Sequence, residues 1–114
     1  MTAAEDCPLV ELRHYHMRDL AAREYFDRRS KAVTFPLFVK YGFRIRRFWA
    51  DAANPLDVHY LVGWESEEEK ERLWAQFRSD PLWTQMVEAD GYVAPMEWAE
   101  SVMLVSAVEP ETVF

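Results

Sequence analysis

Hydrophobic and polar residues alternate at residues 8–16, in the segment PLVELRHYH. A period of two is typical of a β-strand, whose side chains point alternately to the two faces of a sheet. Residues 43–50 and 57–65 are rich in β-branched and aromatic residues, and the turn formers between them predict a hairpin. A fourth strand is predicted over residues 97–108. On the first strand, one face carries Val10, Leu12, His14 and His16, and the other carries Leu9, Glu11, Arg13 and Tyr15.

The first helical region is predicted over residues 19–42. Asp19 is placed to cap its N-terminus, and Pro36 is expected to kink or interrupt it. Gly42 is placed to end it in a left-handed turn. Its apolar residues recur at helical spacing and predict one buried face, made of Ala22, Phe26, Val33, Leu37 and Tyr41.

A second helical region begins at Ser66, which forms a capping box with Glu69. The sequence Ser-Asp-Pro at residues 79–81 breaks this region, and Pro81 begins a second helical piece. The order β-α-β-β-α-β predicts an α+β, ferredoxin-like fold, with a four-stranded antiparallel sheet and two helical regions on one face. We expect one domain over residues 1–114, with a structured core at about 8–109.

Both faces of the predicted sheet are apolar. The third strand shows this with Val58, Tyr60, Val62 and Trp64 on one face and His59, Leu61 and Gly63 on the other. Two helical regions can cover only one face, and an antiparallel sheet with a face in water normally carries polar residues there. Burial of apolar surface contributes ~25 cal/mol per Å². The sequence therefore predicts a homodimer in which a second copy covers the open sheet face.

Composition excludes several classes of partner. Half of the 114 residues are hydrophobic, which is too many for a disordered chain. The net charge of −7 disfavours a nucleic-acid or anionic-membrane partner. The lone Cys7 has no cation beside it in the sequence and excludes an intramolecular disulfide or a cysteine-based zinc cage. The acidic start MTAAEDCP resembles neither a signal nor a transit peptide, so we expect a cytoplasmic protein. We also expect it to use no cofactor.

Four short motifs resemble the NIPSNAP family. They are ELRHYH at residues 11–16, GFRIRRFW at 42–49, GWES at 63–66 and DPLW at 80–83, and the resemblance spans roughly residues 9–107. It implies membership of the dimeric α/β-barrel superfamily, in which two ferredoxin-like chains pair their sheets into a barrel. The family implies no agreed reaction. Related branches include cofactor-free monooxygenases of aromatic polyketides, haem-binding enzymes, and lactone or muconate isomerases.

His14 and His16 are the candidate catalytic residues. Two apart on a strand, their side chains project from the same face about 7 Å apart. This spacing suits two nitrogen ligands of a metal, or an acid/base pair. A metal site needs a third ligand, and His59 is assigned to the opposite face, so no metal is predicted. The acid/base hypothesis requires both histidines to face a pocket between sheet and helices, and the alternative makes them polar residues at its mouth.

Candidate binding residues come from the second and third strands. Arg47 suits an anionic substrate group by bidentate contact, or a salt bridge to a glutamate. Trp49, Tyr60 and Trp64 are assigned to the side of His14 and suit a flat hydrophobic ligand, although aromatic residues more often form core. Arginines interleaved with aromatic residues at 44–49 also resemble a nucleic-acid strip, but they more simply protect an edge strand from pairing.

Two functions remain open from the sequence. The first is binding of a small hydrophobic or aromatic molecule between sheet and helices, with cofactor-free acid/base chemistry of the monooxygenase or isomerase kind. The second is a non-catalytic protein-interaction or structural homodimer module. No Walker, H-E-x-x-H or G-x-S-x-G motif is present to decide between them.

Overall fold

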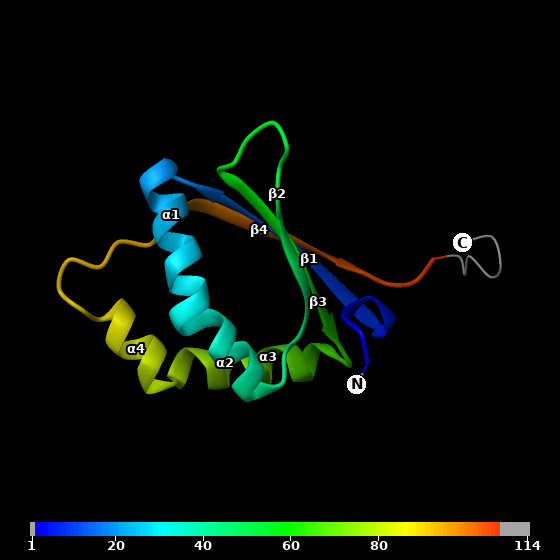
Figure 1. The fold of residues 1–114 in the computed structure, drawn as a ribbon. Helices are drawn as coiled ribbons and strands as arrows, with labels where there is room; N and C mark the ends of the chain where they lie inside the picture. The colour runs from blue at the N-terminus through cyan, green and yellow to red at the C-terminus, as the bar shows by residue number, and fades with distance from the viewer. Residues whose placement is uncertain (1, 108–114) are drawn as a thin grey trace.

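The structure, a computed structural model, describes residues 2–107. A four-stranded antiparallel sheet has the order β2-β3-β1-β4, and the helices pack on one face of it (Figure 1). This is the predicted ferredoxin-like α+β arrangement, with the predicted order of elements. The strands are β1 (Leu9–Met17), β2 (Arg44–Ala50), β3 (Asp57–Trp64) and β4 (Met96–Leu104).

The last strand is shorter than predicted. It ends at Leu104, and residues 105–107 continue without strand structure. The predicted strand end at Val108 and the predicted end of the structured core at 109 lie outside the described residues.

The helical layer consists of two long segments, each divided in two. A π-helical turn, η2 (Ser30–Thr34), joins the first pair of helices. None of the helices in the described part of the chain is long and apolar enough to cross a membrane. The helices are α1 (Leu20–Arg29), α2 (Phe35–Tyr41), α3 (Glu67–Ser79) and α4 (Pro81–Val87).

The predicted helix ends are confirmed. The Asp19 carboxylate accepts a hydrogen bond from the Ala22 N–H at 2.8 Å, and Ser66 Oγ accepts one from the Glu69 N–H at 3.1 Å. Gly42 follows α2 in the left-handed region, with φ of 73°. Local sequence therefore fixes where the two helical segments begin and where the first one ends.

The predicted interruption at Pro36 takes the form of the π turn η2. Proline has no N–H, so the Ala32 carbonyl loses its normal helical donor. The chain widens just before the proline, and the Phe35 N–H bonds instead to the carbonyl of Ser30, five residues back. This widening brings Ser30 and Thr34 to the layer that faces the sheet.

The side of the sheet that faces the helices forms the core. β1 and β3 alternate as predicted, so every second side chain points into this layer, where most are buried and Leu9 and Arg13 are partly buried. From the sheet come Tyr15, Met17, Val58, Tyr60, Val62 and Trp64, and from the helices and the loop before β2 come Phe26, Leu37, Phe38, Phe43, Leu73, Trp74 and Phe77.

The opposite side of the sheet, here called the open face, carries exposed apolar residues. By strand register, Val10 and Leu12 of β1 pair with Leu104 and Val102 of β4, and His16 pairs with Trp98. Trp98 is 42% exposed, Val102 is 49% exposed and Leu104 is 42% exposed. The predicted two-sided apolar sheet is therefore present, and one side of it has no helix over it (Figure 1).

One end of the open face is covered by the N-terminal turn η1 (Ala4–Asp6). A Cβ built on Gly63 would lie 2.5 Å from the Ala4 carbonyl oxygen and from Cys7 Sγ, so glycine is required there. Cys7 is buried, and Arg44 Nε donates to its sulfur at 3.2 Å. The sequence-based expectation that no cation lies near Cys7 is wrong, because the strand that supplies Arg44 is distant in sequence.

Asp80 joins the two helical segments. Its Oδ1 accepts from the Leu82 N–H at 2.9 Å, while its Oδ2 accepts from Lys40 Nζ at 2.6 Å and from the Tyr41 hydroxyl at 2.7 Å. The hydrogen bond from Lys40, followed by those from Tyr41 and Leu82, lowers the pKa of Asp80 from 3.8 to about 2. One carboxylate thus starts α4 and holds α2 against it.

We expect Asp80→Asn to lower the melting temperature by several degrees at pH 6. A folded-state pKa below the ordinary value means that this stabilisation is complete above about pH 4 and is lost as the pH falls toward 2. The difference in melting temperature between the two proteins should therefore close over that range, as measured by circular dichroism. Asp90→Asn, at an exposed position nearby, is the control and should show no such gap. A gap independent of pH would contradict the role of the charge.

Candidate functional site

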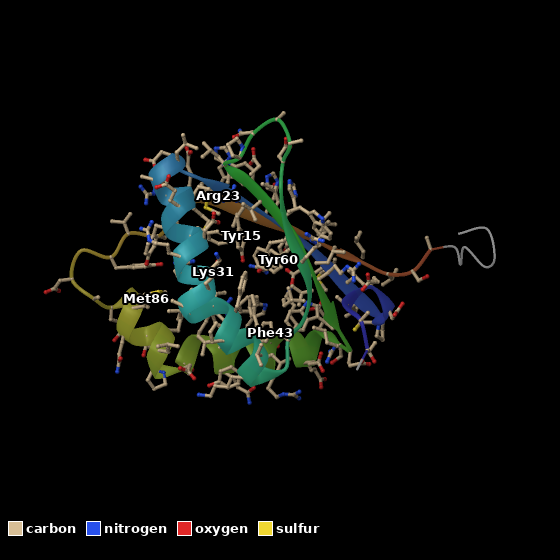
Figure 2. The ribbon with its side chains drawn as sticks, viewed as in Figure 1. Tyr15, Arg23, Lys31, Phe43, Tyr60 and Met86 are labelled. Carbon is tan, nitrogen blue, oxygen red and sulfur yellow. The ribbon has the colours of Figure 1, made fainter. Side chains whose placement is uncertain are left out.

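A cavity of about 200 Å³, here called the inner cavity, lies between the sheet and the helices. Figure 2 shows Tyr15 and Tyr60 directed from the sheet toward the helical layer. Most of the lining is aromatic, and all four strands contribute to its floor or walls. Its lining residues are Arg13, Tyr15, Phe26, Arg29, Thr34, Phe38, Phe48, Tyr60, Trp74, Phe77, Arg78, Trp83 and Met96.

A short polar chain crosses the floor of the inner cavity. The hydroxyl oxygens of Tyr15 and Tyr60 are 2.7 Å apart, and Arg13 Nε donates to Tyr15 at 3.1 Å. The Phe48 ring stacks on Tyr60 with centroids 4.1 Å apart, and the Arg13 guanidinium lies 4.9 Å from the Trp74 ring centroid. The tyrosine hydroxyls are thus fixed in position among aromatic rings.

Tyr60 is a hydrogen-bond donor at neutral pH. Burial is the main cause that raises the pKa of Tyr60 well above 10, with Tyr15 adding to the shift and Arg13 opposing it. Burial lowers the pKa of Arg13, but Tyr60, Tyr15 and Glu11 outweigh that effect and raise it. The floor therefore presents the neutral Tyr60 phenol beside the cationic Arg13.

Glu11 lies beneath this floor and is fully buried. It accepts from Trp64 Nε1 at 3.1 Å and from Arg13 Nη1 at 2.9 Å, and Lys70 Nζ is 3.8 Å away. Its oxygens are thus engaged within the protein. Trp64 is also fully buried and does not line the cavity, so the structure gives this predicted binding residue a role in the core instead.

Arg29 brings an unpaired charge to the inner cavity. The residue is 6% exposed, and its Nη1 donates to the Tyr92 hydroxyl at 2.7 Å. Its guanidinium lies 5.0 Å from the Trp83 ring centroid and 5.8 Å from that of Tyr25. Within residues 2–107, no carboxylate forms an ion pair with Arg29, and its Nε has no hydrogen-bond partner.

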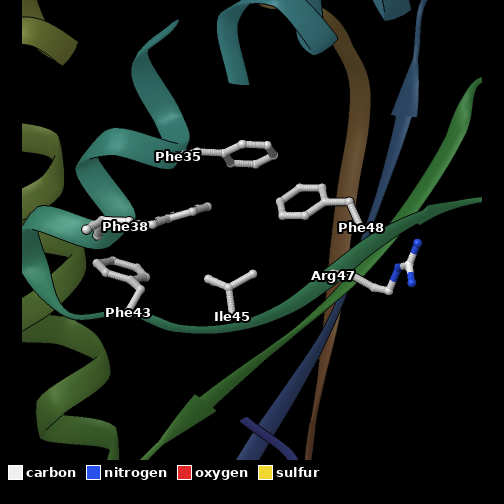
Figure 3. A pocket seen from close by; sticks show the side chains of 7 residues that line it. Phe35, Phe38, Phe43, Ile45, Arg47 and Phe48 are labelled. Atoms are coloured by element: carbon white, nitrogen blue, oxygen red, sulfur yellow. The ribbon is translucent and has the colours of Figure 1, made fainter. Parts of the chain in front are cut away.

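A second hollow of about 540 Å³, here called the edge pocket, lies between α2 and β2. It is lined by Phe35, Phe38, Val39, Phe43, Ile45, Arg47 and Phe48. Phe38 and Phe48 also line the inner cavity. Figure 3 shows the Phe48 ring turned toward Phe35 and Phe38, while the Arg47 side chain extends away from these rings.

Arg47 does not lie inward, where an anchor for a bound anion would have to lie. A β-bulge falls between Arg46 and Trp49, where Arg47 and Phe48 lie opposite the single residue Tyr60 of β3. The extra residue shifts the alternation of faces along β2. Phe48 consequently points inward to stack on Tyr60, and Arg47 is exposed at the rim of the edge pocket. Among the described residues, no carboxylate forms an ion pair with Arg47.

The three histidines gather on the open face, around Asp57. Asp57 Oδ1 lies 2.8 Å from both His14 Nε2 and His16 Nδ1, and the His14 and His59 rings stack with centroids 4.1 Å apart. Hydrogen bonds from His16, then from His14, lower the pKa of Asp57. His16 also stacks on Trp98, at 5.1 Å. No group of three or more potential ligands suited to a metal ion is found among residues 2–107.

The expectation that His14 and His16 face the helix-side pocket is therefore wrong. In the register of β1 and β3, His14 pairs with His59 and Arg13 pairs with Tyr60. Paired residues share a face, so Tyr60 lies with Arg13 in the core and the histidines lie on the open face. Trp49 pairs with His59 and so lies on the same face as His14, as expected. The predicted placement of His59 on the face opposite His14 is wrong, because the two residues are paired and their rings stack.

The comparisons with known proteins give a consistent result for the fold. No family model matches the sequence, and no curated protein matches it either. A solved NIPSNAP-domain protein of Burkholderia xenovorans, itself uncharacterized, is 23% identical, with a TM-score of 0.68 over 87% of this chain and 94% of that chain. A NIPSNAP family protein of Agrobacterium tumefaciens is 17% identical, with a TM-score of 0.72 over 87% and 92% of the two chains.

A solved structure of lower identity, described as an enzyme, has a similar fold. A candidate antibiotic biosynthesis monooxygenase of Nitrosomonas europaea is 12% identical, with a TM-score of 0.59 over 88% of this chain and 99% of that chain. At such identities the likeness establishes the fold, and function depends on the residues of the site. The chain has the fold of NIPSNAP-domain proteins, as its sequence motifs predict.

Proposed function

We propose that this protein binds a small hydrophobic or aromatic molecule in the inner cavity. The observation that carries the proposal is a cavity walled by aromatic rings whose floor holds the fixed polar chain Arg13–Tyr15–Tyr60. Mostly apolar pockets with a few convergent polar groups are typical of small-molecule sites. The fold shared with a candidate monooxygenase is consistent with such a site.

The lining favours binding over proton abstraction. The described residues of the inner cavity include no histidine and no carboxylate. The Tyr15–Tyr60 pair instead offers a neutral O–H donor, which suits an oxygen that carries negative charge. Any cofactor-free chemistry of the kind that the family resemblance implies would therefore use Tyr60 to stabilise an oxyanion.

We also propose that the protein acts as a homodimer through its open face. Trp98, Val102 and Leu104 are exposed there, on the face of the sheet that no helix covers. Exposed apolar patches of this kind are rare on monomers and mark contact surfaces. A second copy is the partner that the resemblance to dimeric α/β-barrel proteins supports. This face also keeps open the alternative of a non-catalytic interaction module.

The binding proposal is tested by titrating 2-naphthol, a neutral flat molecule, into ¹⁵N-labelled protein. We expect the indole N–H signals of Trp74 and Trp83 to shift, because both rings line the inner cavity. The signal of Trp98, on the open face, should not move. Saturable shifts confined to Trp98, or no shift at any of the three indoles, would contradict the proposal.

A variant that fills the cavity provides the second part of the test. Thr34 lines the cavity, and its buried hydroxyl has no partner, so Thr34→Phe removes no hydrogen bond. We expect it to weaken 2-naphthol binding at least tenfold. Ala32→Phe introduces the same ring at an exposed position of the same π turn and should leave the affinity unchanged.

A further inference from the structure

We propose that the molecule bound in the inner cavity is an aromatic carboxylate whose anionic group pairs with Arg29. This inference rests on the proposed function, because it names the class of molecule that the cavity takes. It is carried by the charge of the lining and by the buried hydrogen-bond donors that the protein leaves unpartnered.

The charge of Arg29 calls for an anion. A guanidinium does not lose its proton in a protein, and a buried cation without a counter-ion is strongly unfavourable. The rings of Trp83 and Tyr25 and the Tyr92 hydroxyl stabilise Arg29 in part, but none of them carries a negative charge. Within residues 2–107, the two buried carboxylates are already engaged: Glu11 by Arg13 and Trp64, and Asp80 by Lys40 and Tyr41.

The unpartnered polar atoms of the lining are hydrogen-bond donors. Within the described part of the chain, Arg29 Nε, Trp74 Nε1 and Thr34 Oγ1 are buried without a partner, and all three residues line the inner cavity. The arginine and tryptophan atoms can only donate, and the hydroxyl can do so. A buried donor without a hydrogen-bond acceptor costs free energy, so the complementary ligand is rich in acceptors. A carboxylate supplies two acceptor oxygens.

The tyrosine pair adds another donor. Tyr15 and Tyr60 together have two hydroxyl hydrogens, and the 2.7 Å bond between them uses one. Arg13 Nε donates to the Tyr15 oxygen and so occupies an acceptor position, not a hydrogen. One phenolic hydrogen therefore remains for an acceptor outside the pair. This hydrogen lies on the floor of the cavity, where it suits a further oxygen of the ligand.

The rest of the lining explains why the carboxylate is aromatic. The protein as a whole is acidic, with a net charge of −7, yet its cavity lining contains three arginines and no described acid. Each guanidinium lies over an indole: Arg13 and Arg78 over Trp74, and Arg29 over Trp83. The space of about 200 Å³ between these rings suits one or two fused rings stacked on aromatic side chains.

The test compares three molecules of similar size in titrations followed by ¹⁵N-resolved spectra. Benzoate has the ring and the charge, benzyl alcohol has only the ring, and cyclohexanecarboxylate has only the charge. We expect benzoate to bind about tenfold more tightly than benzyl alcohol, because a hydrogen bond to a charged group is stronger than one to a neutral group. It should also bind several-fold more tightly than cyclohexanecarboxylate, because only an aromatic ring gains from stacking on the rings of the lining. Benzoate should also shift the Trp74 indole N–H, whereas the Trp64 indole, already bonded to Glu11, should stay in place.

Substitutions of Arg29 link the preference to one residue. Arg29→Met should lose the preference for benzoate over benzyl alcohol and bind benzyl alcohol within about twofold of the unchanged protein. Without ligand it should be at least as stable, because an unpaired buried cation has been removed. Arg29→Lys, which keeps the charge but not the planar fork, should retain part of the preference. Arg28→Met, at the exposed neighbouring position, is the matched control and should leave all three affinities unchanged.

The outcomes separate this inference from the proposed function. If benzyl alcohol binds as tightly as benzoate, the cavity is a binding site but the anion assignment is wrong. If cyclohexanecarboxylate equals benzoate, the aromatic assignment is wrong. If none of these three molecules nor 2-naphthol shifts the Trp74 and Trp83 indoles, the proposed function itself fails. A preference for benzoate that survives in Arg29→Met overturns the role given to Arg29.

Discussion

Val102→Glu is expected to dissociate the proposed dimer into monomers at micromolar concentration. Val102 lies on the open face opposite Leu12 and is 49% exposed in the single chain. In a two-fold symmetric contact the substitution introduces two carboxylates into an apolar surface. An unpaired buried charge costs about 3 kcal/mol or more, which raises the dissociation constant about 100-fold or more. Sedimentation velocity over a range of concentrations measures this shift directly.

Val39→Glu is the matched control for this experiment. Val39 is 82% exposed on α2, in the helical layer on the other side of the molecule. The same substitution there should leave the oligomeric state unchanged. The dimer proposal is contradicted if the unchanged protein is a folded monomer at low micromolar concentration, or if Val102→Glu and Val39→Glu associate equally.

The second large effect is expected for Glu11→Met, which should lower the free energy of unfolding by about 3–5 kcal/mol. The residue is fully buried, and the substitution removes the carboxylate that accepts from Arg13 and Trp64. The Arg13 charge would then remain in the core without its counter-ion, and the indole N–H would lose its acceptor. Urea unfolding followed by circular dichroism, at one fixed protein concentration, gives the difference.

Two further variants identify the origin of the loss. Glu11→Gln keeps an acceptor for Trp64 but not the charge, so its stability should fall between those of Glu11→Met and the unchanged protein. Glu24→Met, at an exposed position on α1, should change stability by less than about 0.5 kcal/mol. A Glu11→Met protein as stable as the unchanged one would show that Arg13 does not depend on this ion pair.

The fold is predictable from the sequence because its signals are local. Alternation defines the strands, and Asp19, Ser66 and Gly42 define helix ends through hydrogen bonds to near neighbours or through a single backbone angle. Even the interruption before Pro36 follows from a missing donor within one turn. Each of these signals acts over a few residues and requires no knowledge of the tertiary structure.

The site is only partly predictable, because alternation separates two faces without telling which one the helices cover. His14 and Tyr15 are equally plausible inward residues when both faces are apolar. The register of β1 with β3 shows which residues share a face, and only the packing of the helices shows that Tyr15 and Tyr60 are on the covered one. The bulge in β2 adds a second uncertainty, since it moves Phe48 inward in place of Arg47. Tyr60 alone among the predicted site residues lines the inner cavity.

The main residue missed from the sequence, Arg29, does have a signal there. It follows Ala22 and Phe26 at spacings of seven and three, which places it on the buried face of α1. An arginine at such a position calls for an explanation, because charged residues are rarely fully buried unless paired. Its anionic partner cannot be read from the same helix, so the sequence alone shows the position but not its purpose.

The position of Phe48 has a consequence for how the proposed ligand would enter and leave the inner cavity. Its ring and that of Phe38 line both the edge pocket and the inner cavity, and both hollows lie on the helix side of the sheet, away from the histidines and Val102. The proposed ligand would therefore enter and leave by rotation of these two phenyl rings, without dissociation of the proposed dimer. Side-chain rotation is far faster than subunit dissociation. The residence time of the ligand would therefore be set by its contacts in the inner cavity and not by dissociation of the proposed dimer.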